Sequence, residues 1–88
     1  MDVDDLRKVL RSLDQESLKV LKYFIKHRSV GELIAIRELR GLYRINDPAK
    51  CIGKLIDLGL LERGIGCYNI SKELLKALKS KELGEGLV

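Results

Sequence analysis

Residues 55–71, which read LIDLGLLERGIGCYNIS, decide the fold of this chain. The first residues of this stretch are typical of the end of an amphipathic helix, and Gly59 stands where a helix C-cap needs a left-handed residue. Two short runs, 61–63 and 67–70, flank the glycine-rich tripeptide 64–66, which is the spacing of a β-hairpin. The stretch therefore predicts a helix that leads directly into a two-stranded hairpin.

Length and composition limit what the chain can be. Its 88 residues make one small domain, and the 45% of hydrophobic residues are enough for a core and too many for disorder. No run of residues approaches the roughly 18 consecutive apolar positions that indicate a membrane span. The N-terminal residues are acidic and lack the basic start and apolar stretch of a signal peptide. We therefore expect a cytoplasmic protein.

The net charge of +4 is unevenly distributed along the chain. Residues 1–16 carry five acids and three bases, residues 17–29 carry four bases and no acid, and residues 37–54 carry five bases and two acids. Such a distribution could orient a polyanion such as nucleic acid, and it is equally typical of solvated helix faces. The chain also lacks Thr and Trp and has few Asn and Gln, which favours a thermophilic, archaeal source.

Apolar spacing and capping residues predict the order of the elements. Asp14, Asp47 and Ser71 suit helix N-caps, and Pro48 suits a first helical position, where no amide proton is needed. The expected elements are helix 3–12, helix 15–27, strand 33–36, helix 37–44, helix 48–58, strands 61–63 and 67–70, and a helix after Ser71. Residues 83–88 are expected to be loose. The predicted fold class is mainly α with a small β-hairpin (α+β).

This order of elements resembles the winged helix-turn-helix superfamily, in particular the small archaeal and bacterial DNA-binding regulators of the MarR and ArsR type. The residues that carry the resemblance are Leu18, Leu21, Phe24, Ile36, Leu39, Ile52, Leu55, the run from Leu58 to Arg63, Tyr68, Ile70 and Ser71. The resemblance implies a winged helix-turn-helix core over residues 14–71. Residues 1–13 would be an N-terminal helix that mediates dimerisation, and residues 72–88 a C-terminal helix and tail.

The resemblance also implies that helix 47–58 docks in the major groove of double-stranded DNA. The candidate DNA-binding residues are Arg37, Arg40, Arg44, Asn46, Lys50, Gly53, Lys54 and Arg63. Lys50 and Lys54 are four residues apart and share one helix face, from which either could contact a phosphate or a guanine edge. The arginines would position the domain on phosphates, and Gly53 would allow a close backbone approach.

The main functional prediction is therefore a transcription regulator that binds double-stranded DNA as a homodimer, with leucine stripes of the first and last helices at the dimer interface. Alternatively, these stripes pack on their own domain.

The predicted wing has a single basic residue, Arg63, and Asp47 and Asp57 would repel phosphate. These features favour a second prediction, a protein-docking accessory subunit of a replication or transcription complex. Its binding surface would be the terminal stripes or the tail residues Leu87 and Val88. An inert structural role or a toxin–antitoxin partner is a third alternative.

Catalytic and metal-binding motifs are absent from the sequence. Cys51, Cys67 and His27 do not have the number or spacing of a zinc site. The cysteines could form a disulfide of the kind found in hyperthermophiles, or remain half-buried thiols, and oxidation of Cys51 could serve as a redox signal. The tripeptide 64–66 is a hairpin tip and not a phosphate-binding loop. We therefore expect no enzymatic activity, no metal and no cofactor.

Overall fold

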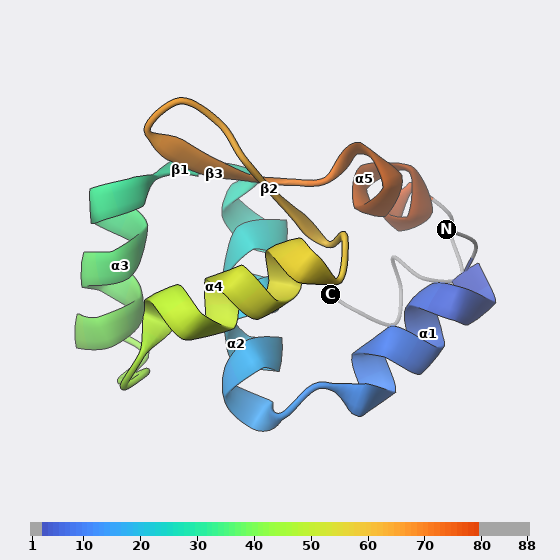
Figure 1. Cartoon of the computed structure of the whole chain (residues 1–88), viewed down its shortest axis with the longest axis horizontal. Coiled ribbons are helices and arrows are strands. Elements are labelled where there is room, and N and C mark those ends of the chain that lie inside the picture. Colours follow the sequence, from blue (N-terminus) through green and yellow to red (C-terminus); the bar gives the residue numbers. More distant parts are fainter. Residues whose placement is uncertain (1–2, 80–88) are drawn as a thin grey trace.

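A computed structural model describes residues 3–79 as a single helical domain with a small sheet (Figure 1). The elements are α1 (Val3–Ser12), α2 (Gln15–His27), β1 (Ser29–Gly31), α3 (Glu32–Gly41), α4 (Pro48–Asp57), β2 (Leu61–Arg63), β3 (Cys67–Ile70) and α5 (Lys72–Leu78). The three strands form an antiparallel sheet in the order β1-β3-β2. The predicted fold class and element order are confirmed, whereas the winged helix-turn-helix assignment itself stays a prediction. The predicted loose segment 83–88 lies outside the described residues.

The predicted helix boundaries at the capping residues are confirmed. The side chain of Asp14 accepts from the backbone N–H of Ser17 at 3.3 Å, and that of Asp47 accepts from Lys50 at 3.2 Å. Ser71 caps α5 in the same way, through the N–H of Leu74 at 3.0 Å. Each bond satisfies one of the free donors at a helix start, so these boundaries depend on residues three positions apart.

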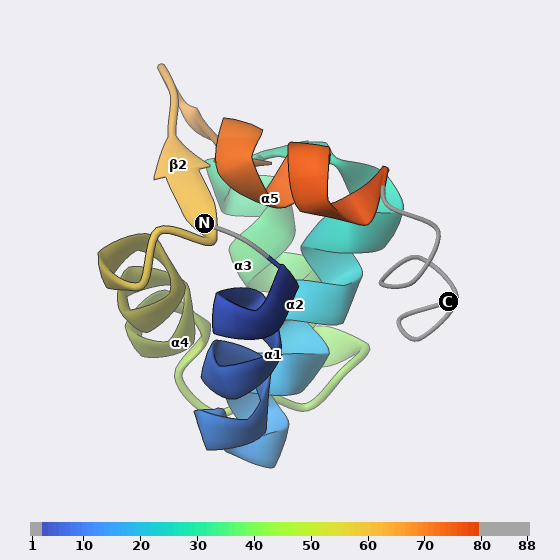
Figure 2. The same cartoon turned by 90° about the vertical axis from the view of Figure 1, so that its right-hand side faces the viewer.

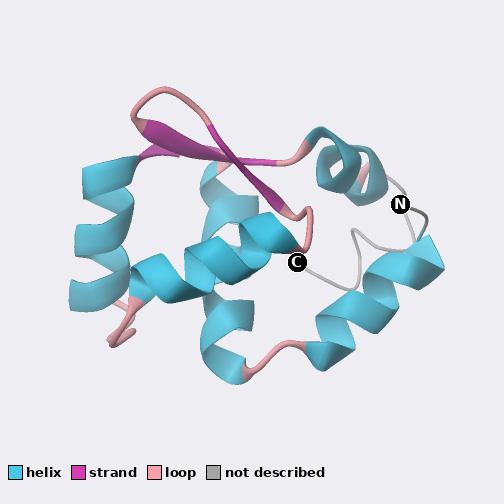
Figure 3. Ribbon diagram, in the orientation of Figure 1, coloured by secondary structure: helices cyan, strands magenta, loops and turns pink. Residues whose placement is uncertain are grey.

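The hairpin follows α4 as predicted. Gly59 has a φ of 78°, the left-handed conformation that ends the helix and redirects the chain into β2. Register pairs Leu61 with Ile70 and Arg63 with Tyr68. Figure 3 shows the loop between β2 and β3 arching beyond the strands, close to the start of α3.

The predicted strand 33–36 and the predicted start of the next helix at residue 37 are wrong. Residues 33–36 form the first turn of α3, and the strand lies earlier, at Ser29–Gly31. A run of four apolar residues fits a helix or a strand equally well, and tertiary pairing decided between them. Val30 pairs with Tyr68 of β3, which fixes the strand at 29–31. The helix also ends at Gly41 and not at residue 44.

Both terminal helices contribute to the core of the domain. Leu6 of α1 and Leu74 of α5 are fully buried in the cluster that α2, α3, α4 and the sheet form. The neighbouring residues Val9, Leu10, Leu13, Leu75 and Leu78 are partly buried against it. Figure 2 shows α1 and α5 on the same side of the molecule. The leucine stripes thus pack on their own domain, which was the alternative to a dimer interface.

Candidate functional site

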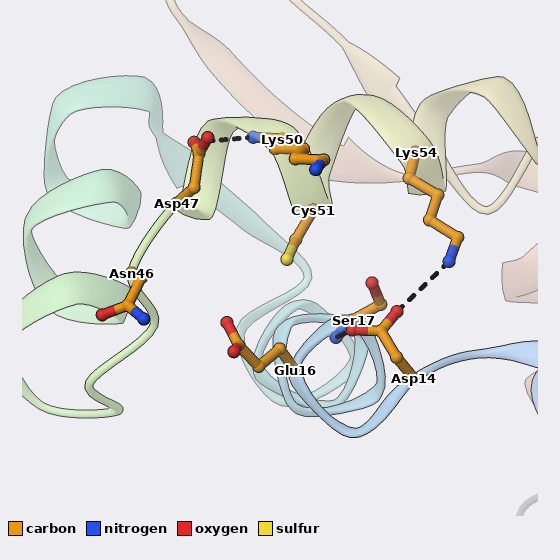
Figure 4. A pocket seen from close by; sticks show the side chains of 8 residues that line it. All are labelled: Asp14, Glu16, Ser17, Asn46, Asp47, Lys50, Cys51 and Lys54. Atoms are coloured by element: carbon orange, nitrogen blue, oxygen red, sulfur yellow. Dashed lines mark hydrogen bonds and ion pairs between the residues drawn. The ribbon is translucent and has the colours of Figure 1, made fainter.

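Three of the residues predicted to bind DNA line one cleft between α4 and the start of α2. Asn46, Lys50 and Lys54 lie there, in a space of about 450 Å³ (Figure 4). The other lining residues are Asp14, Glu16, Ser17, Asp47 and Cys51. Both lysines belong to α4. Because they are four residues apart, they lie on the same side of this helix, which is not the side that faces the core.

The cleft carries charges of both signs. The sequence indicated that Asp47 would repel phosphate, but not that Asp14 and Glu16 lie in the same cleft. The Lys54 ammonium lies 3.2 Å from Oδ1 of Asp14, the N-cap residue of α2. Hydrogen bonds from Ser17 and Lys54 hold the pKa of the Asp14 carboxyl at about 2, so Asp14 is ionised at neutral pH. Glu16 and Asp47 add two further carboxylates to the same cleft. A phosphate that approached Lys50 here would meet three acidic side chains.

Cys51 points from α4 into this cleft, toward the start of α2 (Figure 4). Burial raises the pKa of the Cys51 thiol, because it disfavours a thiolate. A hydrogen bond with Ser17 acts in the opposite direction, and the carboxylates of Asp14 and Glu16 raise the pKa further. Cys51 and Cys67 are both free thiols, so the disulfide alternative is not observed. The raised pKa disfavours the reactive thiolate, and oxidation of Cys51 as a redox signal stays a prediction.

The predicted phosphate-contacting arginines lie in three other places. Arg37 and Arg40 are exposed on the outer face of α3, and Arg44 lies in the loop before α4, with a left-handed φ of 56°. Arg63 of β2 lies over the ring of Tyr68, with its guanidinium carbon 5.6 Å from the ring centroid. The structure therefore does not gather all of the predicted residues into the cleft at α4.

Gly53 is a helical position with space around it. Apart from its chain neighbours and the backbone of its own helix, a Cβ atom added there would meet no atom of the described chain within 4 Å. Internal packing therefore does not require glycine at this position. The close backbone approach that the sequence suggested would have to involve another molecule.

Sequence reasoning missed an apolar surface on α3 and the hairpin tip. Leu33 is 81% exposed, Ile34 57% and Ile65 104%, although large apolar side chains are usually buried. Leu33 also lines a groove of about 460 Å³ along α3, together with Glu32, Ile36, Arg37, Arg40 and Gly41. Interpreting residues 33–36 as a strand concealed this surface. An isoleucine between two glycines at a hairpin tip was the signal that could have indicated it.

Among residues 3–79, no three His, Cys, Asp or Glu side chains lie together in a way that could hold a metal ion. Within the same residues, no helix has the length and apolar character needed to cross a membrane.

The fold and these features define a small α+β domain that presents a mixed-charge cleft and an apolar helix face. The chain belongs to the PolB1 Binding Protein 2 family, whose model matches residues 14–76, from the N-cap of α2 into α5. No curated protein matches the chain. This family match does not show the resemblance to MarR and ArsR regulators that the sequence suggested.

Proposed function

We propose that this chain is a protein-docking accessory subunit that binds the polymerase PolB1 in a replication complex. The observation that carries the proposal is the match to the PolB1 Binding Protein 2 family over residues 14–76. The proposal corresponds to the alternative predicted from the sequence, and it takes the place of transcription regulation as the leading function.

The surface of the domain supports a protein partner in two ways. The predicted DNA-reading helix α4 faces a cleft with three carboxylates, and one of its two lysines is already paired with Asp14. Elsewhere the domain exposes large apolar side chains at Leu33, Ile34 and Ile65. Exposed apolar side chains that gather in one place mark interaction sites, because their burial against a partner is favourable.

The direct test is to mix purified PolB1 with the full chain and measure binding by isothermal titration calorimetry and size-exclusion chromatography. We expect a saturable heat signal and co-elution of the two proteins. Unrelated basic proteins of similar size serve as controls for nonspecific binding to the polymerase. The absence of a complex at tens of micromolar protein, on the order of the weakest specific interfaces, would refute the proposal.

Double-stranded DNA binding is a second candidate function. It is supported by the exposed side chains of Arg37, Arg40, Arg44 and Lys50, and by a helix, α4, that leads directly into a hairpin. In this proposal the domain is a winged helix, α4 enters the major groove and a homodimer binds the site. The test is fluorescence anisotropy of a labelled random-sequence duplex at several salt concentrations. Micromolar affinity that falls steeply with salt would support it, and no binding at low salt would reject it.

A further inference from the structure

The outer side of α3 combines apolar and basic side chains. Leu33, Arg37 and Arg40 follow each other at intervals of four and three residues, so they share one side of the helix, and Ile34 lies beside them. All four are exposed. The buried side of the same helix is provided by Ala35 and Leu39. The helix is thus anchored by one side and presents apolar groups on the other.

The hairpin tip is fixed next to this side of α3. The backbone N–H of Glu32 donates to the carbonyl of Gly66 at 2.9 Å, and the Tyr68 hydroxyl donates to Oε1 of Glu32 at 3.1 Å. The first bond holds Gly66, which follows Ile65, against Glu32, which precedes Leu33, and the second ties β3 to the same glutamate. Figure 1 shows the tip of the hairpin next to the start of α3. We call the combined surface of Leu33, Ile34, Arg37, Arg40 and Ile65 the α3 face.

We propose that the α3 face is the surface that docks on PolB1, and that it meets an apolar patch bordered by carboxylates. This inference rests on the proposed function, because PolB1 is the partner named there. The apolar centre needs an apolar partner, since burying Leu33 and Ile65 against polar groups would gain nothing. The two arginines need acidic partners, and their planar guanidinium groups pair with carboxylates in a bidentate geometry.

Two other surfaces that the sequence singled out fit a protein partner less well. The leucines of α1 and α5, which the sequence suggested as a docking surface, are used in the core of the domain. The cleft at α4 contains paired and opposing charges, and burying these would carry a desolvation cost. The centre of the α3 face is formed by exposed apolar side chains that are not used in the core, and its groove along α3 offers space for a protruding side chain of the partner.

Calorimetric titration of purified PolB1 with variants of the full chain tests whether the α3 face is the docking surface. We expect Leu33→Glu combined with Ile65→Glu to weaken binding at least about tenfold, as at a central hot spot. The control is Leu42→Glu, which introduces a single glutamate at another exposed leucine, 73% exposed, just beyond the far end of α3. The control should bind as the unaltered chain does. Circular dichroism spectra of all variants verify that they fold.

A second pair of variants tests the charge complementarity and does not alter apolar residues. Arg37→Glu with Arg40→Glu should weaken binding about tenfold or more and reduce its salt dependence, because two arginine–carboxylate pairs are lost. Lys8→Glu with Lys76→Glu, at exposed positions of α1 and α5, is the matched control for net charge. Both helices lie at the opposite end of the molecule from α3 (Figure 1), so replacing these lysines should leave affinity unchanged.

The outcomes distinguish failure of the proposed docking surface from failure of the proposed PolB1 binding. If the unaltered chain binds PolB1 and both sets of α3-face variants bind equally well, the location is wrong and the proposed function stands. If the control variants lose affinity as strongly as the α3-face variants, the loss is not specific to this surface and the location is again wrong. If the unaltered chain does not bind PolB1, the proposed function fails, and the location fails with it.

Discussion

The ammonium nitrogen of Lys54 lies 3.2 Å from Oδ1 of Asp14, so the exposed side of α4 is tied to the N-cap of α2. The two side chains are 48% and 55% exposed, and a surface pair of this kind contributes little to the stability of a fold. Its consequence is electrostatic. One of the two lysines that the sequence placed against DNA is already matched by a carboxylate of its own chain.

The pair makes a prediction about acid stability. The folded-state pKa of Asp14 is about 2, below its ordinary value of 3.8, so the ionised carboxylate stabilises the fold. The stabilisation by the Asp14 carboxylate is complete when the pH is well above 3.8, and it is lost as the pH falls toward 2. We expect Asp14→Asn, which keeps a capping side chain, to melt at a lower temperature than the unaltered chain at pH 7. Thermal melts followed by circular dichroism should show this difference shrinking between pH 4 and pH 2. A difference that stays constant with pH would contradict the assignment.

The Cys51 thiol should react slowly. Burial and the neighbouring carboxylates raise its pKa above the ordinary value of 9.0, so little thiolate is present at neutral pH. In a Cys67→Ser background, we expect alkylation of folded Cys51 by iodoacetamide at pH 8 to be slower than alkylation of the same variant in denaturant. Mass spectrometry measures both rates. Equal rates would show an accessible, reactive thiol, and would favour the redox hypothesis.

Charge reversal at Lys50 distinguishes the two candidate functions. Under the proposed function, Lys50→Glu should change PolB1 affinity by less than about twofold, since exposed charges away from an interface contribute little. Under the DNA-binding candidate, it should weaken duplex binding several-fold and reduce the salt slope by about one. Lys54→Glu is a poorer test, because it would place a second carboxylate beside Asp14. Anisotropy and calorimetry on the same variant provide the comparison.

Two glycine substitutions should have opposite effects on stability. Gly53→Ala should raise the free energy of unfolding by about 0.5–1 kcal/mol, because the position is helical and an added Cβ meets nothing within 4 Å beyond its chain neighbours and its own helix backbone. Gly59→Ala should lower it by roughly 1–2 kcal/mol, because φ is 78° there. Urea denaturation at neutral pH measures both. A loss of stability on Gly53→Ala would mean that α4 needs its glycine for an internal reason.

The burial of Leu6 tests whether α1 belongs to the domain or to a dimer. Because Leu6 is fully buried in the core of a single chain, Leu6→Ala should cost about 2–5 kcal/mol of stability. The unfolding midpoint of the unaltered chain should also be independent of protein concentration. A midpoint that rises with concentration would show that folding is coupled to dimerisation, as the leucine stripes first suggested.

The sequence by itself determined the features that depend on neighbouring residues. Asp14, Asp47 and Ser71 cap their helices through amides three positions away, and Gly59 ends α4 by its own conformational freedom. These local signals were sufficient for the element order, the hairpin and the fold class. They also placed Asn46, Lys50 and Lys54 together, because one short segment carries all three.

Only the tertiary structure decided where strand β1 lies and what the surfaces present. Ser29–Gly31 is a strand because β3 pairs with it, and this pairing leaves Leu33 and Ile34 to form the exposed side of α3. Leu6 is a core residue because it shares one buried cluster with residues from the other helices and the sheet, far from it in the sequence. Lys54 is neutralised by Asp14, which is 40 residues away in the sequence. Contacts between residues so far apart leave no signal in the neighbouring sequence. Hydrophobic periodicity shows which side of a helix or strand is apolar, but not which other element packs against that side.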